Sequence, residues 1–433
     1  MRSAHQYTAI TKLARNLKNG SEAGTRFEKG VQASILELRY NSPMSTKNIK
    51  VAVGLSGGVD SAVSAYLLKS QGYQVAGVHM QCWDYSSETC KGNEDRSDAV
   101  AICGQLEIKF KFLNFENEYK SKVIDHFYSE YRAGRTPNPD VLCNKEIKFG
   151  LFLDWAMQEG FDFVATGHYA RINNLHLLKG VDESKDQSYF LYRLTQDQLA
   201  KSLFPVGEMK KSEVRKIAQE QKLVVAEKAE SMGICFVGEV DINKFLKREI
   251  EPKQGEVILK STGEVIGTHE GVWFYTIGQR HGFEIKKYVG LPLYVVGKNV
   301  DQNQLIVGFY NDCLRDSFTV SDSHFIVGDF KGIGKVEEIS PRGFACDVRI
   351  RHLGQLYKAQ VIASSACVES NGITLCGDSL WTSNASSSSL RFALVDESVY
   401  IVKLEQPAFG VAPGQSAVFY LGDEVLGGGI IQI

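Results

Sequence analysis

The chain has no long apolar run, since no stretch approaches the roughly 20 residues that cross a bilayer. We therefore expect a soluble protein that does not enter a membrane. It also has no excess of one charge, because its 433 residues carry 49 Lys and Arg against 51 Asp and Glu, a formal net charge of −2. This balance excludes a uniformly basic nucleic-acid-binding protein, so any contact with nucleic acid must come from local basic surfaces.

Cysteine pairs that would bind zinc are absent as well. The nine cysteines stand at positions 82, 90, 103, 143, 235, 313, 346, 367 and 376, with no CxxC pair and no zinc-type spacing. Without a secretory signal they are expected to be reduced thiols, most of them buried packing residues. Cys143 and Cys235 are the two whose neighbours suggest chemistry.

Residues 1–45 precede the first regular pattern, and we expect a disordered extension or a leader. Basic residues come before the first acid, Glu22, as in organelle transit peptides, but further glutamates weaken that pattern. Met44 directly precedes the first strand and could equally be the true start. A dispensable extension in a cytoplasmic protein is therefore favoured, with the mitochondrial matrix as the alternative if residues 1–43 are a leader.

Strand and helix patterns alternate over residues 49–167. Apolar strands are expected at 51–54, 75–80, 109–114 and 163–166, and helices after the first two strands. This α/β rhythm predicts a parallel sheet with helices on both faces. Ligands in such folds lie at the carboxyl ends of strands, which is where Gly54, Met80 and Gly167 fall.

The remaining chain changes character twice. Helical patterning covers residues 196–251, including an amphipathic helix that begins at 210–215. After Pro252, short β-type runs bounded by glycine are expected at 256–259, 273–276, 293–296 and 304–308. We place an α/β domain with a helical segment at 46–251, a small β domain at 252–315 and a β-barrel or sandwich at 316–433. The Ser-rich stretch 383–389 reads as a loop inserted between strands.

The most informative stretch follows the first strand and opens a helix. It consists of Gly54, Leu55, Ser56, Gly57, Gly58, Val59, Asp60 and Ser61. Small residues let backbone N–H groups close on an anion at the positive end of the helix dipole. No Lys follows the glycines, as it would in ordinary NTPases. The Ser-Gly-Gly-x-Asp-Ser form resembles loops that split ATP into AMP and pyrophosphate to adenylate a carbonyl or carboxyl oxygen. A glycine-rich turn without a ligand is the alternative.

Two thiols follow this loop in the sequence. Cys143 lies between a Pro-rich turn and a basic helix, where nearby Lys145 and Lys148 would lower its pKa and make it a plausible nucleophile. A buried structural thiol is an equal alternative. Cys235 lies in a loop with glycines on both sides. A pair of thiols suits sulfur transfer, because one cysteine carries the sulfur and the other releases it by disulfide formation.

Together, these motifs resemble the tRNA-specific 2-thiouridylase family of the ATP pyrophosphate-loop superfamily. The resemblance covers residues 48–433 in order. It is carried by SGGVDS (56–61), NPDVLCNKEIKFG (138–150), ATGHYAR (165–171), KDQSYFL (185–191), SMGICFVG (231–238), TIGQRHG (276–282) and PGQSAVFY (413–420). It implies an ATP pyrophosphatase domain of the adenine nucleotide alpha hydrolase type with a helical tRNA-binding part, a small β domain and a C-terminal β-barrel.

The resemblance also implies a reaction. ATP adenylates the C2 oxygen of the wobble uridine of certain tRNAs, and a persulfide sulfur displaces AMP to give 2-thiouridine. By motif position, Cys235 would accept the persulfide sulfur. Cys143 would attack it, freeing sulfide or forming a disulfide as the product leaves. Asp140 could act as general acid or base at the uridine.

For the nucleotide, the resemblance implies that residues 54–61 hold the phosphates while Met80 and Gly167 bracket the adenosine. Met80 as an ordinary core methionine is the alternative. Mg²⁺ is implied by the pyrophosphate chemistry, with Asp60 a candidate ligand. An iron–sulfur cluster near Asp140, Cys143 and Cys235 is allowed by the family, but three potential ligands are too few to infer it.

For tRNA, the resemblance implies contacts from several motifs. They are Asn138, Pro139 and Asp140 around the target base, Lys185, Asp186 and Gln187 at the RNA, and His168, Arg351, His352 and Gln415. The cluster Lys210, Lys211, Arg215 and Lys216 could grip the backbone, although such a run is usually a solvated helix face. Taken alone, His168 is more often a structural histidine.

The implied partners are tRNAs that accept Lys, Glu and Gln, and a sulfur donor that is either a cysteine desulfurase or a persulfide relay carrier. A monomer is expected. The Ser-rich insertion lengthens the last domain and puts the direction of Arg351 and His352 in doubt. An amide-forming synthetase with the same loop would leave both cysteines without a task. A tRNA-binding protein without catalysis would not need Asp60, Asp140 or the cysteines.

Overall fold

The computed structural model describes residues 46–83, 91–229, 241–287, 290–326, 343–363, 367–370, 373–376 and 399–433. The chain divides into Met1–Asn48, of which only the 3₁₀ turn η1 (Thr46–Asn48) is described, and Ile49–Ile433, which carries everything below. The predicted extension at 1–45, Cys235 and the Ser-rich stretch 383–389 lie outside the described residues.

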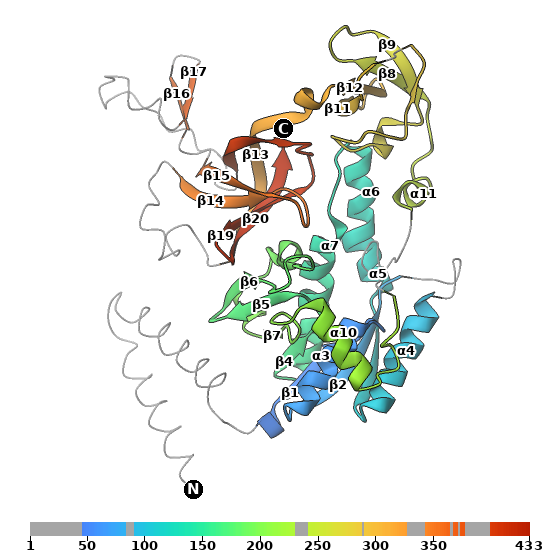
Figure 1. The fold of residues 1–433 in the computed structure, drawn as a ribbon, viewed down its shortest axis with the longest axis vertical. Helices are drawn as coiled ribbons and strands as arrows, with labels where there is room; N and C mark the ends of the chain where they lie inside the picture. The colour runs from blue at the N-terminus through green and yellow to red at the C-terminus, as the bar shows by residue number, and fades with distance from the viewer. Residues whose placement is uncertain are drawn as a thin grey trace. The chain divides into compact units, whose positions relative to one another are not determined.

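A five-stranded parallel sheet forms the first part of Ile49–Ile433 (Figure 1), and four of its strands were predicted from the sequence. Its order is β3-β2-β1-β4-β7. The strands are β1 (Lys50–Gly54), β2 (Gln74–Gln81), β3 (Lys109–Asn114), β4 (Phe163–Ala165) and β7 (Ser202–Leu203). Val51, Ala52 and Val53 are each 0% exposed, which explains the unbroken apolar run in β1.

Helices cover both faces of this sheet. They are α3 (Val59–Ser70), α4 (Lys91–Gln105), α5 (Glu116–Tyr119), the π-helix η2 (Lys120–Ile124), α6 (Asp125–Arg132), α7 (Pro139–Leu142), the π-helix η3 (Cys143–Leu151) and α8 (Phe152–Gln158). Val51 and Val53 join a hydrophobic cluster with α3 and α4, whereas Ala52 joins another with α6 and α8. Alternate residues of one strand thus serve two cores.

The segment predicted as helical, 196–251, is helical only in part. It contains α9 (Gln196–Leu199), α10 (Lys211–Glu220) and α11 (Ile242–Leu246), with β7 between the first two. Upstream lie the hairpin β5 (Ala170–Asn173) and β6 (His176–Lys179) and the 3₁₀ turn η4 (Ser188–Leu191). A strand as short as β7 has too few residues to show a period, which is why the pattern missed it.

A small mixed sheet follows, in the order β10-β9-β8-β12-β11. Its strands are β8 (Gly255–Leu259), β9 (Val265–His269), β10 (Glu284–Ile285), β11 (Tyr294–Asn299) and β12 (Gln304–Gly308). The strand predicted at 273–276 is wrong, because the 3₁₀ turn η5 (Val272–Phe274) stands there. Gly271 has φ +137, and Val272 N donates to Asn303 Oδ1 at 3.1 Å, so the chain turns where its aromatic residues favoured a strand.

Lys298 of β11 is a half-buried base in this sheet. Its Nζ donates to the Tyr275 carbonyl oxygen at 2.6 Å. Burial lowers the pKa of Lys298 to about 8, whereas a lysine in an unfolded chain titrates at about 10.4. Between these pKa values unfolding takes up a proton, so stability rises with pH. Below the folded pKa the ammonium is charged in both states and its burial cost is constant.

Replacing Lys298 by Met should remove this pH dependence. Relative to the variant, the wild type should gain about 2 kcal/mol of unfolding free energy between about pH 7 and about pH 9.5. Urea denaturation at both pH values measures the difference. Lys286→Met is a control, because its side chain is 51% exposed. An equal difference between wild type and Lys298→Met at both pH values would refute the expectation.

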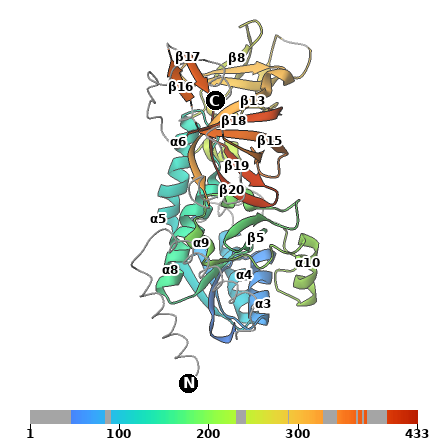
Figure 2. The ribbon, with the colours of Figure 1, turned by 90° about the vertical axis from the view of Figure 1, so that its left-hand side faces the viewer.

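The C-terminal strands close into a barrel (Figure 2). The order is β13-β18-β15-β14-β19-β20, and β20 pairs again with β13. The 3₁₀ turn η6 (Tyr310–Cys313) leads into β13 (Leu314–Phe325), β14 (Phe344–Arg349), β15 (Leu356–Ala363), β18 (Tyr400–Phe409), β19 (Ser416–Leu421) and β20 (Glu424–Gln432). The β5–β6 hairpin joins it through Leu178 opposite Glu424. β16 (Cys367–Ser370) and β17 (Ile373–Cys376) pair separately.

The predicted fold class, a parallel-sheet α/β domain followed by a small β domain and a β-barrel, is thus confirmed. Within the described ranges, no helix is both long and apolar enough to cross a membrane.

Candidate active site

The glycine-rich loop joins the carboxyl end of β1 to α3, at the position where the strand order reverses. Gly57 has φ +74, and a Cβ there would stand 2.5 Å from the Asp95 carbonyl oxygen. Gly58 is the N-cap of α3 and offers no side chain to the helix end. The loop therefore needs glycine for both conformation and space. Leu55 N already donates to the Val78 carbonyl oxygen at 2.8 Å and Ser56 N to Ser61 Oγ at 3.3 Å, so an anion would meet the backbone amides at the start of α3.

The residues predicted to bind the nucleotide come together around this loop. A Cβ on Gly54 would lie 3.1 Å from Met80 Cε, and one on Gly167 would lie 2.8 Å from the backbone of Asp60 and Ser61. Met80 is 6% exposed, so it is also a core residue, which agrees with the alternative interpretation as an ordinary core methionine. The close packing leaves the neighbouring strand ends against the loop, an arrangement that suits an adenine nucleotide.

Asp60 of this loop is held by two residues that the sequence did not assign to it. Lys211 Nζ lies 2.7 and 2.9 Å from the two carboxylate oxygens, and the Tyr169 hydroxyl donates to Oδ1 at 2.8 Å. A Mg²⁺ ion on Asp60, as predicted, would therefore have to take the place of Lys211. Among the described residues, no three His, Cys, Asp or Glu side chains are grouped to hold a metal.

The basic cluster at the start of α10 does not form one surface. Lys211 points to the loop, Arg215 donates to the Lys228 carbonyl oxygen at 3.2 Å, and Lys216 is 74% exposed beside Glu220. The prediction of a solvated helix face therefore holds for Lys216 but not for Lys211, which contacts the loop. The helical period does not reveal which tertiary partner each lysine meets.

A second lysine, Lys228, also reaches the loop. Its Nζ donates to the Gly57 carbonyl oxygen at 3.1 Å and contacts Asp95 and Asp98. Burial alone would lower the pKa of Lys228, but the hydrogen bonds that its ammonium donates to the two carboxylates outweigh burial and raise the pKa. This contact could not be predicted from the sequence, because Lys228 and the two aspartates are more than 120 residues apart.

Cys143 lies where α7 passes into η3, and it is 0% exposed. Lys145 Nζ lies 3.2 Å from Glu146, and Lys148 Nζ lies 3.5 Å from His168 Nε2. Asp140 is half-buried on the first turn of α7. The full burial of Cys143 fits the alternative that it is a structural thiol. Its position one helical turn after Asp140 also fits the predicted site. Cys235 lies outside the described residues.

A loop of the barrel holds the turn that precedes α7. Gln415 Nε2 donates to the Thr136 and Pro137 carbonyl oxygens at 2.8 and 3.2 Å, and Thr136 N donates to Pro413 O at 2.9 Å. Gln415, predicted to contact tRNA, thus positions the turn that carries Asn138, the N-cap of α7.

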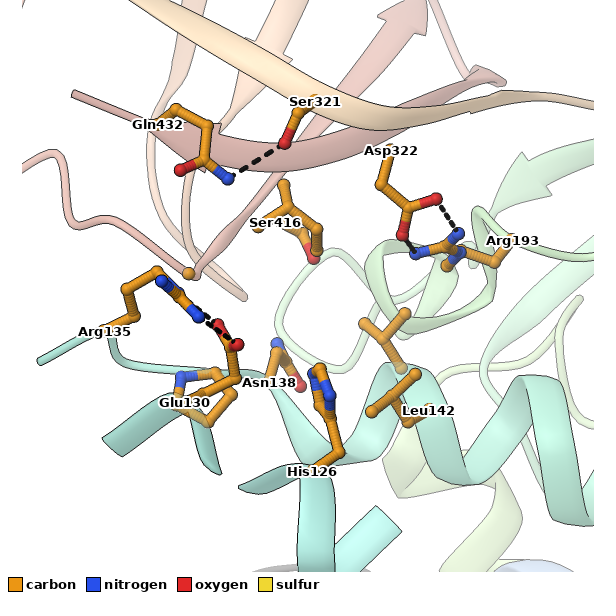
Figure 3. Close-up of a pocket in the computed structure, with 14 residues that line it drawn as sticks. His126, Glu130, Arg135, Asn138, Leu142, Arg193, Ser321, Asp322, Ser416 and Gln432 are labelled. Carbon is orange, nitrogen blue, oxygen red and sulfur yellow. Dashed lines mark hydrogen bonds and ion pairs between the residues drawn. The ribbon is translucent and has the colours of Figure 1, made fainter. Parts of the chain in front are cut away.

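A cavity of about 380 Å³ opens beside this turn (Figure 3). Two arginines on its walls are paired with carboxylates, Arg135 with Glu130 and Arg193 with Asp322 at 2.6 and 2.8 Å. Neutral polar groups, including Asn138, supply most of the other hydrogen-bonding capacity. The cavity therefore fits a neutral polar group better than a phosphate.

In the motif Lys185-Asp186-Gln187, the side chains of Asp186 and Gln187 make hydrogen bonds within the protein. Asp186 is 1% exposed, pairs with Arg349 at 2.8 Å, and accepts from two backbone amides. Gln187 Oε1 accepts from Tyr169 N at 3.0 Å. Lys185 is half-buried. The buried carboxylate of Asp186 thus joins neighbouring segments of the chain, and its contact with tRNA stays a prediction.

The predicted histidines are uncharged at neutral pH. Burial, and then Lys148, holds the pKa of His168 well below its usual range, and Thr166 Oγ1 lies 2.7 Å from its Nδ1. Burial lowers the pKa of His352 to about 4, and its ring lies 4.3 Å from that of Phe190. Neither ring can therefore attract phosphate by charge. Arg351 donates to the Ile277 and Gly410 carbonyl oxygens.

Comparison with known proteins gives three matching family models. They are the tRNA methyl transferase HUP domain at residues 49–239, the tRNA methyl transferase PRC-barrel domain at 243–309 and the aminomethyltransferase beta-barrel domain at 384–431. Among solved structures, the U34-tRNA thiolase NcsA from Methanococcus maripaludis with its 4Fe-4S cluster is 20% identical and covers 53% of this chain and 76% of its own. The TM-score is 0.31.

Similarity to curated proteins extends over nearly the whole chain. The tRNA-specific 2-thiouridylases MnmA of Staphylococcus aureus (strain bovine RF122 / ET3-1) and Staphylococcus carnosus (strain TM300) are each 42% identical over 398 residues, which is 90% of this chain and 96% of theirs. At that identity and coverage, the chain belongs to the tRNA-specific 2-thiouridylase (MnmA) family.

Proposed function

We propose that this chain is a tRNA-uridine 2-sulfurtransferase that consumes ATP. The observation that carries the proposal is the pyrophosphate-type loop at the carboxyl end of β1 in a chain that is 42% identical to 2-thiouridylases over 90% of its length. The loop supplies the activation that replacement of a carbonyl oxygen by sulfur requires, because the oxygen of an unactivated uridine is a poor leaving group.

The thiol and the loop are linked by one helical stretch. Cys143 begins η3, which runs into α8, and Phe152 at the start of α8 lies 3.6 Å from where a Cβ on Gly54 would stand. Phe152 follows Cys143 by nine residues along this stretch. An adenylated base held between the two ends of this stretch could meet the loop at one side and the thiol at the other.

In the first step, the loop amides bind the phosphates of ATP and the C2 oxygen of the wobble uridine attacks the α-phosphorus, releasing pyrophosphate. Asp140 would move a proton at the uridine as general acid or base. Mg²⁺ held at Asp60 would neutralise the leaving pyrophosphate. The steps below do not depend on an iron–sulfur cluster near Asp140 and Cys143.

In the second step, the outer sulfur of a persulfide on Cys235 attacks C2, and AMP leaves with the former C2 oxygen. Cys143 then attacks the Cys235 sulfur, which forms a disulfide and frees 2-thiouridine. The two electrons lost by the cysteines are returned by an external thiol reductant. In the alternative order, Cys143 attacks the persulfide first and releases sulfide, which then displaces AMP.

The partners in this proposal are a tRNA and a protein that delivers sulfur, either a cysteine desulfurase or a persulfide carrier. Two of the matching family models are named for tRNA methyl transfer. Methyl transfer to uridine needs no AMP-forming activation, so the loop favours thiolation.

Nucleoside mass spectrometry tests the proposal. Unmodified tRNA is incubated with the protein, ATP, Mg²⁺ and a persulfide donor, and AMP is measured in the same samples. We expect 2-thiouridine at the wobble position and one AMP for each thionucleoside. AMP without thionucleoside would show that the sulfur assignment is wrong. A methylated uridine that forms without AMP would overturn the function itself.

A further inference from the structure

Lys211 reaches the nucleotide loop from a helix far along the chain. Its side chain is 13% exposed, and its ammonium faces both carboxylate oxygens of Asp60, at 2.7 and 2.9 Å. Tyr169 adds a third hydrogen bond to the same carboxylate. In the structure, therefore, a cation from α10 neutralises the negative charge of the phosphate loop.

The first turn of α10 fixes the position of this lysine. Lys211 N donates to Asp182 Oδ2 at 2.9 Å, and Lys210 N donates to Glu213 Oε2 at 2.7 Å. Val214 and Ala218, each 0% exposed, belong to the hydrophobic cluster that also contains apolar residues of α3. The ammonium is thus presented by a packed element, which limits the entropy lost when it binds a ligand.

ATP brings several negative charges to a loop that already contains a carboxylate. Asp60 repels them unless a cation intervenes, and its carboxylate oxygens both face the ammonium of Lys211. When Mg²⁺ binds Asp60, the ammonium loses its partner at a place where phosphate oxygens arrive. Lysine is a flexible point charge that can change partners without moving its helix.

We propose that Lys211 is part of the ATP phosphate site and exchanges partners there. It neutralises Asp60 while the site is empty, and it contacts the phosphates once Mg²⁺ has taken Asp60. The inference rests on the proposed function, because it presumes that the loop binds ATP.

Replacing Lys211 by Met should have two effects of opposite sign. The affinity for ATP should fall about tenfold or more, since a hydrogen bond to a charged group is lost. The affinity for Mg²⁺ alone should rise, because Asp60 is no longer paired with Lys211. The gain in Mg²⁺ affinity tests the pairing of Lys211 with Asp60, whereas the loss of ATP affinity tests its contact with the phosphates.

Isothermal titration calorimetry measures both affinities in the full chain, with ATP titrated in the presence of Mg²⁺ and with Mg²⁺ titrated alone. Lys216→Met is the matched control, because it removes a lysine of the same helix that is 74% exposed. It should leave both affinities unchanged. Adding Asp60→Asn to Lys211→Met should abolish the gain in Mg²⁺ affinity.

The outcomes separate this inference from the proposed function. Lys211→Arg keeps the charge and should bind ATP within about fivefold of the wild type. A loss of ATP affinity as large as that of Lys211→Met would show that the charge is not what binds ATP. Unchanged ATP affinity in Lys211→Met, together with weaker binding to tRNA, would show that Lys211 contacts RNA and not ATP. The proposed thiolation activity would be unaffected by that result. Failure of the wild type to bind ATP would instead reject the proposed function.

Discussion

Serine at position 143 is expected to stop the formation of 2-thiouridine, by about 1,000-fold or more, as loss of a catalytic nucleophile does elsewhere. Serine is close to cysteine in size, so the fully buried site should still pack. Its hydroxyl cannot form a disulfide with Cys235. Adenylation does not involve the thiol, so AMP should still form when tRNA is present. Nucleoside mass spectrometry and AMP release measure the two steps separately.

The same variant distinguishes the two orders of sulfur transfer. If Cys143 resolves a disulfide between Cys235 and the uridine sulfur, Cys143→Ser should accumulate tRNA that is bound covalently to the protein and released by a thiol reductant. If Cys143 instead frees sulfide from the persulfide, no such adduct should form. Intact-protein mass spectrometry of the reaction distinguishes these cases.

Cys103→Ser is the matched control. Cys103 is 2% exposed in α4, and burial raises the pKa of its thiol to about 11, so it remains protonated at neutral pH. This variant should keep thiolation. Normal thiolation by Cys143→Ser, or equal losses in both variants, would leave Cys143 as the buried structural thiol that its 0% exposure also allows.

The parallel sheet and the nucleotide loop could be predicted because their signals are local. The apolar run of β1 is followed directly by glycines that open α3, and Gly57 adopts the positive φ that such a turn demands. The same holds for β8 and β12, whose residues alternate between turns. Composition and spacing within about ten residues are enough for elements of this kind.

Contacts between distant segments could not be predicted in the same way. Lys211 and Asp60 are 151 residues apart, and Gln415 and Thr136 are 279 apart. A basic helix start or a Gly-Gln turn looks alike in sequence whether it meets RNA, solvent or another domain. The resemblance to a family named these motifs as important, but only the tertiary contacts show that Asp186 and Gln415 hold parts of the protein together.

Asp186→Ala is expected to lower the free energy of unfolding by about 3–5 kcal/mol, because it leaves a buried charge without its partner. Arg349 is 8% exposed, and its guanidinium donates to Asp186 Oδ2 at 2.8 Å. The other carboxylate oxygen accepts from Gly180 N and Ser188 N, each at 3.1 Å. The substitution therefore strands a guanidinium and two backbone amides between the β5–β6 region and the barrel. Urea denaturation measures the loss.

A second ion pair to the barrel supplies the control. Arg193 and Asp322 lie 2.6 and 2.8 Å apart through two hydrogen bonds, but the Asp322 side chain is 64% exposed. The Arg193 side chain is 10% exposed, but water reaches the Asp322 carboxylate and can take its place, so Asp322→Ala should cost less than Asp186→Ala. A direct RNA contact by Asp186 predicts the reverse pattern, in which Asp186→Ala keeps its stability and loses affinity for tRNA. Stability and tRNA affinity of the two variants together therefore decide whether the motif binds RNA itself or holds the barrel to the domain that carries the thiol.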